Sequence, residues 1–121
     1  MKRVLLAILL ILIPLPTATA ASNQITTSAT TPSPPTSLSA TAGNASASIA
    51  FTAGSNGGSA ITNYQYSTNG STYTPLSPAQ SSSPITIPGL TNGTSYSITL
   101  KAVNSIGAST SPSSPVSVTP A

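Results

Sequence analysis

Hydroxyl and carboxamide groups make up almost all of the reactive side chains in this 121-residue chain, which contains no Asp, Glu, His or Cys. A Ser or Thr nucleophile needs a neighbouring base, and none of the usual bases is present. Zinc sites, hard-cation sites and disulfides lack their ligands as well. We therefore expect a protein that is not an enzyme and that binds no cofactor and no metal.

Three asparagines are candidate sites of N-glycosylation. Asn44, Asn69 and Asn92 each begin an Asn-x-Ser/Thr triplet, and each falls in a predicted turn that a glycosyltransferase could reach. The glycine-rich stretch at residues 54–58 has the composition of a phosphate-binding loop. It lacks a following Lys and a helix, so we interpret it as a flexible loop between strands.

The aromatic residues allow two interpretations. Tyr64, Tyr66, Tyr73 and Tyr96 could form a platform for sugar rings, or they could belong to a core. Strand phase favours the core for all except Tyr73, which lies on a predicted edge strand and stays open. Lys101 is expected on the outer face of its strand, in solvent.

The first twenty residues predict the compartment. Lys2 and Arg3 precede an apolar run at residues 4–13, and Ala18 and Ala20 follow in an A-x-A pattern. This is the layout of a signal peptide cleaved after Ala20, and the run is too short to span a bilayer. An uncleaved anchor is the alternative. We expect a secreted or cell-surface protein.

Removal of residues 1–20 takes away Lys2 and Arg3, so the formal charge falls from +3 to +1 (3 − 2 = 1). A single Lys cannot form a basic patch. Nucleic acid is therefore excluded as an expected partner, as is a membrane surface once the leader is cleaved.

The remaining chain divides into two zones. Residues 21–34 are small and polar with several prolines, and we expect a flexible linker, called here the lead-in. Residues 35–121 show short apolar alternations between turn residues, which predicts an all-β domain. Period-two counting places seven strands, around Leu38, Ala47 to Phe51, Ile61 to Tyr66, Tyr73 to Leu76, Ile85 to Ile87, Tyr96 to Ala102, and Val116 to Val118. Seven strands and no helix after the leader predict an immunoglobulin-like sandwich of two antiparallel sheets.

One segment carries a more specific signature. Leu90 is followed by Thr-Asn-Gly-Thr-Ser and then Tyr96, with Ile98, Leu100 and Ala102 alternating after it. Asn104 and Gly107 stand just beyond. This arrangement resembles the fibronectin type III family, and the resemblance covers residues 35–120.

The resemblance implies that Tyr96 buries its ring and bonds through its hydroxyl to backbone. The family usually carries Trp on its second strand, where this chain has Phe51. The expected core is Leu38, Ile49, Phe51, Tyr64, Tyr66, Leu90, Tyr96, Ile98, Leu100 and Ala102. The candidate interaction loop is Asn104, Ser105, Ile106 and Gly107, which lacks the Arg-Gly-Asp of adhesive members.

These observations predict a non-catalytic extracellular or cell-surface module. It would serve as a spacer or as an interaction domain for an extracellular protein or polysaccharide. One alternative is a self-assembling subunit of a surface layer or fibre, because uncharged strand edges would permit weak self-association. Another is the N-terminal piece of a longer multi-module surface protein.

Overall fold

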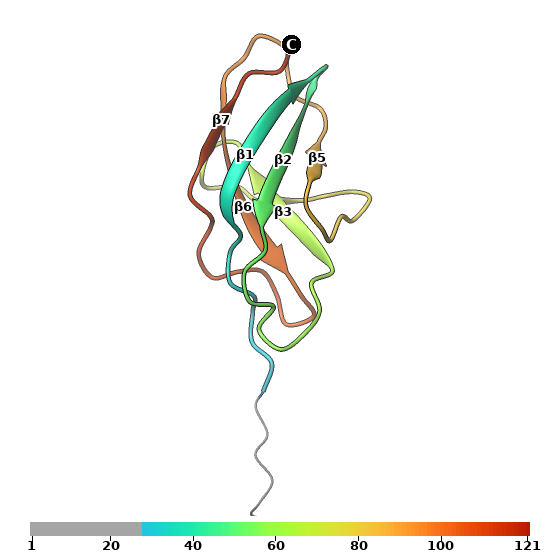
Figure 1. Ribbon diagram of the computed structural model, residues 1–121, viewed down its shortest axis with the longest axis vertical. Coiled ribbons are helices and arrows are strands. Elements are labelled where there is room, and N and C mark those ends of the chain that lie inside the picture. The colour runs from blue at the N-terminus through green and yellow to red at the C-terminus, as the bar shows by residue number, and fades with distance from the viewer. Residues whose placement is uncertain (1–27) are drawn as a thin grey trace, which may run out of the picture.

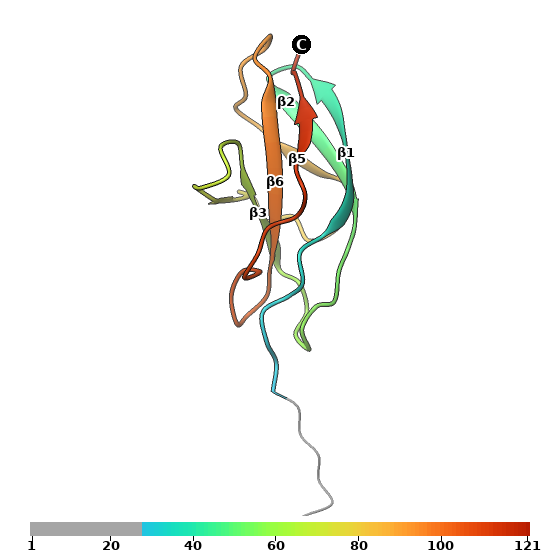
Figure 2. The same cartoon turned by 90° about the vertical axis from the view of Figure 1, so that its left-hand side faces the viewer.

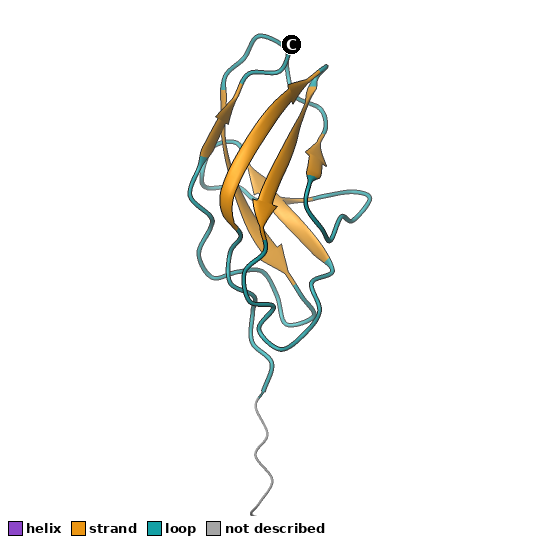
Figure 3. Ribbon diagram, viewed as in Figure 1, coloured by secondary structure: helices purple, strands orange, loops and turns teal. Residues whose placement is uncertain are grey.

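A computed structural model describes residues 28–121, so the predicted leader and the first part of the lead-in lie outside it. Within this range the chain forms seven strands and no helix (Figure 3). The strands are β1 (Thr36–Gly43), β2 (Ser46–Thr52), β3 (Asn63–Ser67), β4 (Thr74–Pro75), β5 (Ile85–Ile87), β6 (Tyr96–Val103) and β7 (Val116–Val118). The predicted all-β class is confirmed.

Two antiparallel sheets form the layers of the sandwich (Figures 1 and 2). One sheet has the order β1-β2-β5, and the other has the order β4-β3-β6-β7. The lead-in and the loops after β2 and β6 lie at one end of the molecule, and the C-terminus lies at the other (Figure 1). The edge position predicted for β4 is confirmed.

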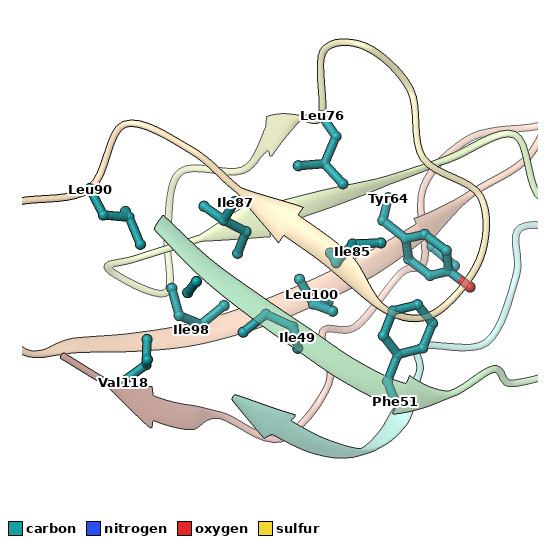
Figure 4. Packing of buried hydrophobic residues seen from close by; sticks show 12 residues of the cluster. Ile49, Phe51, Tyr64, Leu76, Ile85, Ile87, Leu90, Ile98, Leu100 and Val118 are labelled. Carbon is teal, nitrogen blue, oxygen red and sulfur yellow. The ribbon is translucent and has the colours of Figure 1, made fainter. Parts of the chain in front are cut away.

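The core follows from period-two alternation on facing strands. In β2, Ala47, Ile49 and Phe51 point inward, and Ile49 stands opposite Ile85 of β5. Ile98, Leu100 and Ala102 form the matching row on β6 (Figure 4). Each fully buried side chain of this size contributes about 1.5–3 kcal/mol relative to an exposed one. The rings of Phe51 and Tyr64 pack with centroids 4.7 Å apart at an interplanar angle of 57°. Phe51 on β2 thus supplies the aromatic ring that the resemblance assigns to a Trp in other members.

Three residues expected in the core lie at its margin instead. Leu38, Tyr66 and Tyr96 are half-buried, although each packs against the core. Leu38 lies within a break in the β1–β2 register between Thr36 and Ser39, next to Ser37, which has a φ of 56°. Tyr66 pairs with β6 on one side and with the two-residue strand β4 on the other. β4 is too short to cover the ring of Tyr66.

Tyr96 lies at the rim because its hydroxyl reaches an exposed loop. The backbone N–H of Thr91 donates a hydrogen bond of 2.9 Å to this hydroxyl. The bond to backbone is the one the resemblance implied, but the ring is half-buried rather than enclosed. Hydrogen bonding by Thr91, from its side chain first and then its backbone, lowers the pKa of Tyr96. Burial has the opposite effect on Tyr64, whose pKa it raises.

Uncharged side chains complete the hydrogen bonding at two strand edges. The hydroxyls of Ser109 and Ser113 accept from the N–H groups of Ala102 and Leu100, at 3.0 and 2.9 Å, where β7 no longer pairs with β6. On β5, the amide of Gln80 accepts from Thr86 N–H at 2.9 Å and donates to Thr86 C=O at 3.0 Å. A primary amide here occupies the position that a neighbouring strand would take. These edges are therefore less open to strand addition than the composition alone suggested.

Candidate functional site

Asn104 organises the end of the molecule where the lead-in enters. Its side chain is buried at 4% exposure. The Nδ2 group donates to the carbonyls of Thr30 and Asn56, both at 2.8 Å. Its Oδ1 accepts from the N–H groups of Ile106 at 2.9 Å and Gly107 at 3.2 Å. These four bonds use the full capacity of a carboxamide. Asn104 therefore joins three chain segments, and its side chain is not free to contact a partner.

The lead-in packs against the loop after β2. The N–H of Thr30 donates to Gly57 C=O at 2.8 Å, and the N–H of Ser33 donates to Ser55 C=O at 2.9 Å. Pro32 between them is buried. The loop carbonyls and Asn104 thus give Thr30 and Ser33 hydrogen-bond partners that the lead-in composition does not reveal.

Gly57 explains why the loop after β2 is rich in glycine. It adopts a φ of +73°, and a Cβ there would lie 2.7 Å from Thr31 O and closer still to Thr30 O. Gly89 has nearly the same φ, +74°, and a Cβ added there would have nothing within 4 Å. Glycine at position 57 therefore serves both the backbone conformation and the close approach of the lead-in. This loop is a docking surface and not merely a flexible connection.

We call the surface formed by residues 30–33, 55–57 and 104–107 the N-terminal pole. Ile106 stands on it with 54% of its surface exposed, the one large hydrophobic side chain so exposed among residues 28–121. Beside it, the hydroxyls of Ser105 and Ser59 are 2.9 Å apart. Of the four residues predicted as an interaction loop, Asn104 is thus buried, and Ser105 and Ile106 face solvent. A loop fixed by Asn104 presents Ile106 at a defined place.

Tyr73 lies across the outer face of the second sheet. Its hydroxyl is 2.8 Å from Thr99 Oγ1, and Lys101 Nζ lies 4.4 Å from its ring centroid. A cation over the ring is attracted by its π electrons. Because Lys101 occupies one face of the ring, only the other remains for stacking against a sugar. Tyr73 is therefore a poorer sugar platform than its edge position suggested.

The three glycosylation candidates lie in turns and are exposed. Asn92 is held on both sides, because its Nδ2 donates to Asn44 Oδ1 at 2.9 Å and its Oδ1 accepts from Ala45 N–H at 2.7 Å. Asn69 uses its Oδ1 to accept from the N–H groups of Ser71 and Thr72, at 2.8 and 2.9 Å. Both amides stabilise their turns, whether or not a sugar is ever attached.

The surface of the described residues offers no pocket. It also carries no cluster of His, Cys, Asp or Glu that could hold a metal ion. Among residues 28–121 no helix has the length and apolar character needed to cross a membrane.

The fibronectin type III domain profile matches residues 33–119. The chain belongs to the fibronectin type III family. Solved structures agree: titin domains A168–A170 share 28% identity at a TM-score of 0.61, over 75% of this chain and 32% of theirs. The chain thus spans about a third of that titin fragment.

Two further structures match over most of their own length. A fibronectin type III domain of human fibronectin type III domain containing protein 3 is 27% identical, with a TM-score of 0.58, over 78% of this chain and 90% of that one. A Fn3-like protein from Clostridium thermocellum is 25% identical, with a TM-score of 0.56, over 76% and 96%. No curated protein sequence matches significantly. Membership identifies a module of a generally non-catalytic type, and the family match begins after Thr30 to Pro32 of the pole.

Proposed function

We propose that this chain is an extracellular or cell-surface fibronectin type III module that binds a protein partner through the N-terminal pole. The observation that carries the proposal is the exposed Ile106 on a loop that Asn104 holds rigid. A fixed apolar side chain with a polar rim is the arrangement that protein interfaces use at their centres. The rigid loop also lowers the entropic cost of binding.

A protein partner fits this surface better than a polysaccharide. Sugar recognition favours an aromatic ring with a free face, and Tyr73 has Lys101 over its ring. Export is supported by the leader pattern at residues 1–20. The nearly neutral, hydroxyl-rich composition of the rest of the chain does not call for a strongly acidic or basic partner. The non-catalytic role is supported by the lack of any carboxylate side chain, imidazole or thiol in the sequence.

The test is a binding screen with the exported full chain against arrays of extracellular proteins and of glycans. Ile106→Ser is expected to weaken the protein interaction at least about tenfold, which corresponds to about 1.4 kcal/mol. Ala79→Ser, at another exposed apolar position far along the chain, is the matched control and should bind as the parent does. Three results would contradict the proposal. The chain could be retained inside the cell, Ile106→Ser could leave the affinity for the protein partner unchanged, or the chain could bind glycans alone.

A further inference from the structure

The contact between the lead-in and the loops after β2 and β6 has the chemistry of peptide recognition. Two main-chain N–H groups of an extended segment, those of Thr30 and Ser33, donate to carbonyls of the loop after β2. In the reverse direction, Asn104 Nδ2 donates a hydrogen bond to Thr30 C=O. The buried Pro32 lies between the two donors. Main-chain hydrogen bonds combined with a buried proline are a recurring means of binding extended proline-containing segments.

The accepting side of this contact is built without the lead-in. The bonds of Asn104 to Asn56, Ile106 and Gly107 do not involve the lead-in, because these residues all belong to the loops after β2 and β6. Gly57 leaves the room into which Thr30 and Thr31 fit. If the lead-in leaves, the carbonyls of Ser55 and Gly57 and one N–H of the Asn104 side chain lose their hydrogen-bond partners. The site is therefore preorganised for any segment that presents the same groups.

We infer that the loops after β2 and β6 at the N-terminal pole also bind residues 30–34 of a second copy of this chain, in place of the chain's own lead-in. The inference rests on the proposed function, since it names a partner for the same pole. The segment that fits is present on every copy. Lys101 is the one charged side chain among residues 28–121, so copies repel one another little. In a single molecule the covalent connection gives the lead-in a high effective concentration, so exchange between copies is expected only at high protein concentration.

The experiment uses the full chain in a form whose own lead-in is disabled. Thr30→Pro combined with Ser33→Pro removes both N–H donors, and proline is tolerated in an extended, proline-rich segment. A synthetic peptide of residues 28–35 is then titrated into the ¹⁵N-labelled variant. We expect saturable shifts of the Gly57 backbone and Asn104 side-chain amide signals. A peptide with proline at positions 30 and 33 should bind at least about tenfold more weakly, because it lacks both donors.

Two glycine substitutions, each added to the disabled chain, separate peptide binding from general strain. Gly57→Ala places a Cβ where the peptide must lie and should abolish the shifts. Gly89→Ala imposes the same backbone strain at the other end of the molecule and should leave them intact. Equal binding of the two peptides, absence of saturable shifts, or loss caused equally by both glycine variants would overturn the inference.

A measurement on the unsubstituted chain covers the case in which the double-proline variant does not fold. Analytical ultracentrifugation from micromolar to millimolar concentration should show a growing dimer population that Gly57→Ala removes and Gly89→Ala keeps. A strictly monomeric chain throughout would overturn the inference. Neither readout uses export or Ile106, so failure here is distinct from failure of the proposed function.

Discussion

Asparagine side chains join separate chain segments at both ends of the sandwich, but they do so at different depths. At the N-terminal pole the amide of Asn104 is buried and holds the lead-in. At the opposite end, called here the C-terminal pole (residues 43–45, 91–93 and 119–121), exposed Asn44 and Asn92 bond to each other. There Gly93 N–H donates to Pro120 C=O at 2.8 Å. Water can replace a lost bond readily at the exposed pole, and less readily at Asn104, whose side-chain bonds are part-buried. Asparagine therefore contributes more to the free energy of unfolding at the N-terminal pole than at the C-terminal pole.

Asn104→Ala should give the largest effect in this comparison. It leaves the carbonyls of Thr30 and Asn56 and the N–H of Ile106 without the Asn104 side chain at a part-buried site, whereas Gly107 N–H keeps its bond to the backbone C=O of residue 104. We expect the free energy of unfolding to fall by about 2–4 kcal/mol, since each orphaned buried group costs about 1–3 kcal/mol and some will find water. Urea denaturation followed by circular dichroism measures it. Ser105→Ala, the exposed neighbour, is the control, and an equal loss from the two variants would contradict the role given to Asn104.

Gly57→Ala and Gly89→Ala test whether the two poles differ in the room that they leave for a Cβ atom. Both substitutions place alanine at a φ near +74°, a conformation that costs about 1–2 kcal/mol for a residue with a Cβ. Gly57→Ala should cost about 1–2 kcal/mol more, because its Cβ meets the carbonyls of Thr30 and Thr31. Thermal unfolding of both variants measures the difference. A cost that is the same at both positions would mean that the lead-in does not press on Gly57.

Asn92→Ala should have a smaller effect than Asn104→Ala. It removes the bonds to Ala45 N–H and to Asn44. We expect a loss of about 0.5–1.5 kcal/mol, the usual net value of hydrogen bonds at a solvated site. The same urea titration provides the number, with Asn69→Ala as a further exposed asparagine for reference. A loss as large as that of Asn104→Ala would remove the distinction between the two poles.

The tyrosines provide a smaller, pH-dependent contrast between rim and core. Tyr96 should ionise below the ordinary pKa of 10.0 and Tyr64 above it. Above pH 10 the unfolded chain releases the Tyr64 proton while the folded chain keeps it, so stability should fall as the pH rises there. Ionisation of Tyr96 acts in the opposite direction, because the folded chain loses that proton first. Absorbance at alkaline pH resolves the order, and Tyr64→Phe should flatten the fall. Simultaneous titration of both rings would contradict the assignment.

Local patterns were enough to predict the strands. Alternation in Tyr96 to Ala102 and in Ala47 to Phe51 reports the burial of single strands, and it requires no knowledge of their neighbours. Leu38 departs from its pattern because a register break at Ser37 moves it to the margin, and a bulge leaves little trace in composition.

The N-terminal pole could not be predicted in the same way. Asn104 bonds to residues 48 and 74 positions away, so no short window of sequence contains both Asn104 and these two partners. Ser109 and Ser113 are indistinguishable by type from the many exposed serines of this chain, yet they are buried against β6. The one available signal is the glycine cluster at residues 54–58, since glycine often marks a close approach of backbone. Composition alone indicates only flexibility there.

Hydrogen exchange at the Thr30 and Ser33 amides tests the central claim most directly, because both donate to the loop after β2 only if the lead-in is docked. In the full chain, NMR should show both amides protected, and Asn104→Ala should reduce the protection of Thr30 while β6 stays protected. If both amides of the unsubstituted chain exchange as fast as those of a free peptide, the lead-in is not docked and the N-terminal pole does not exist as described.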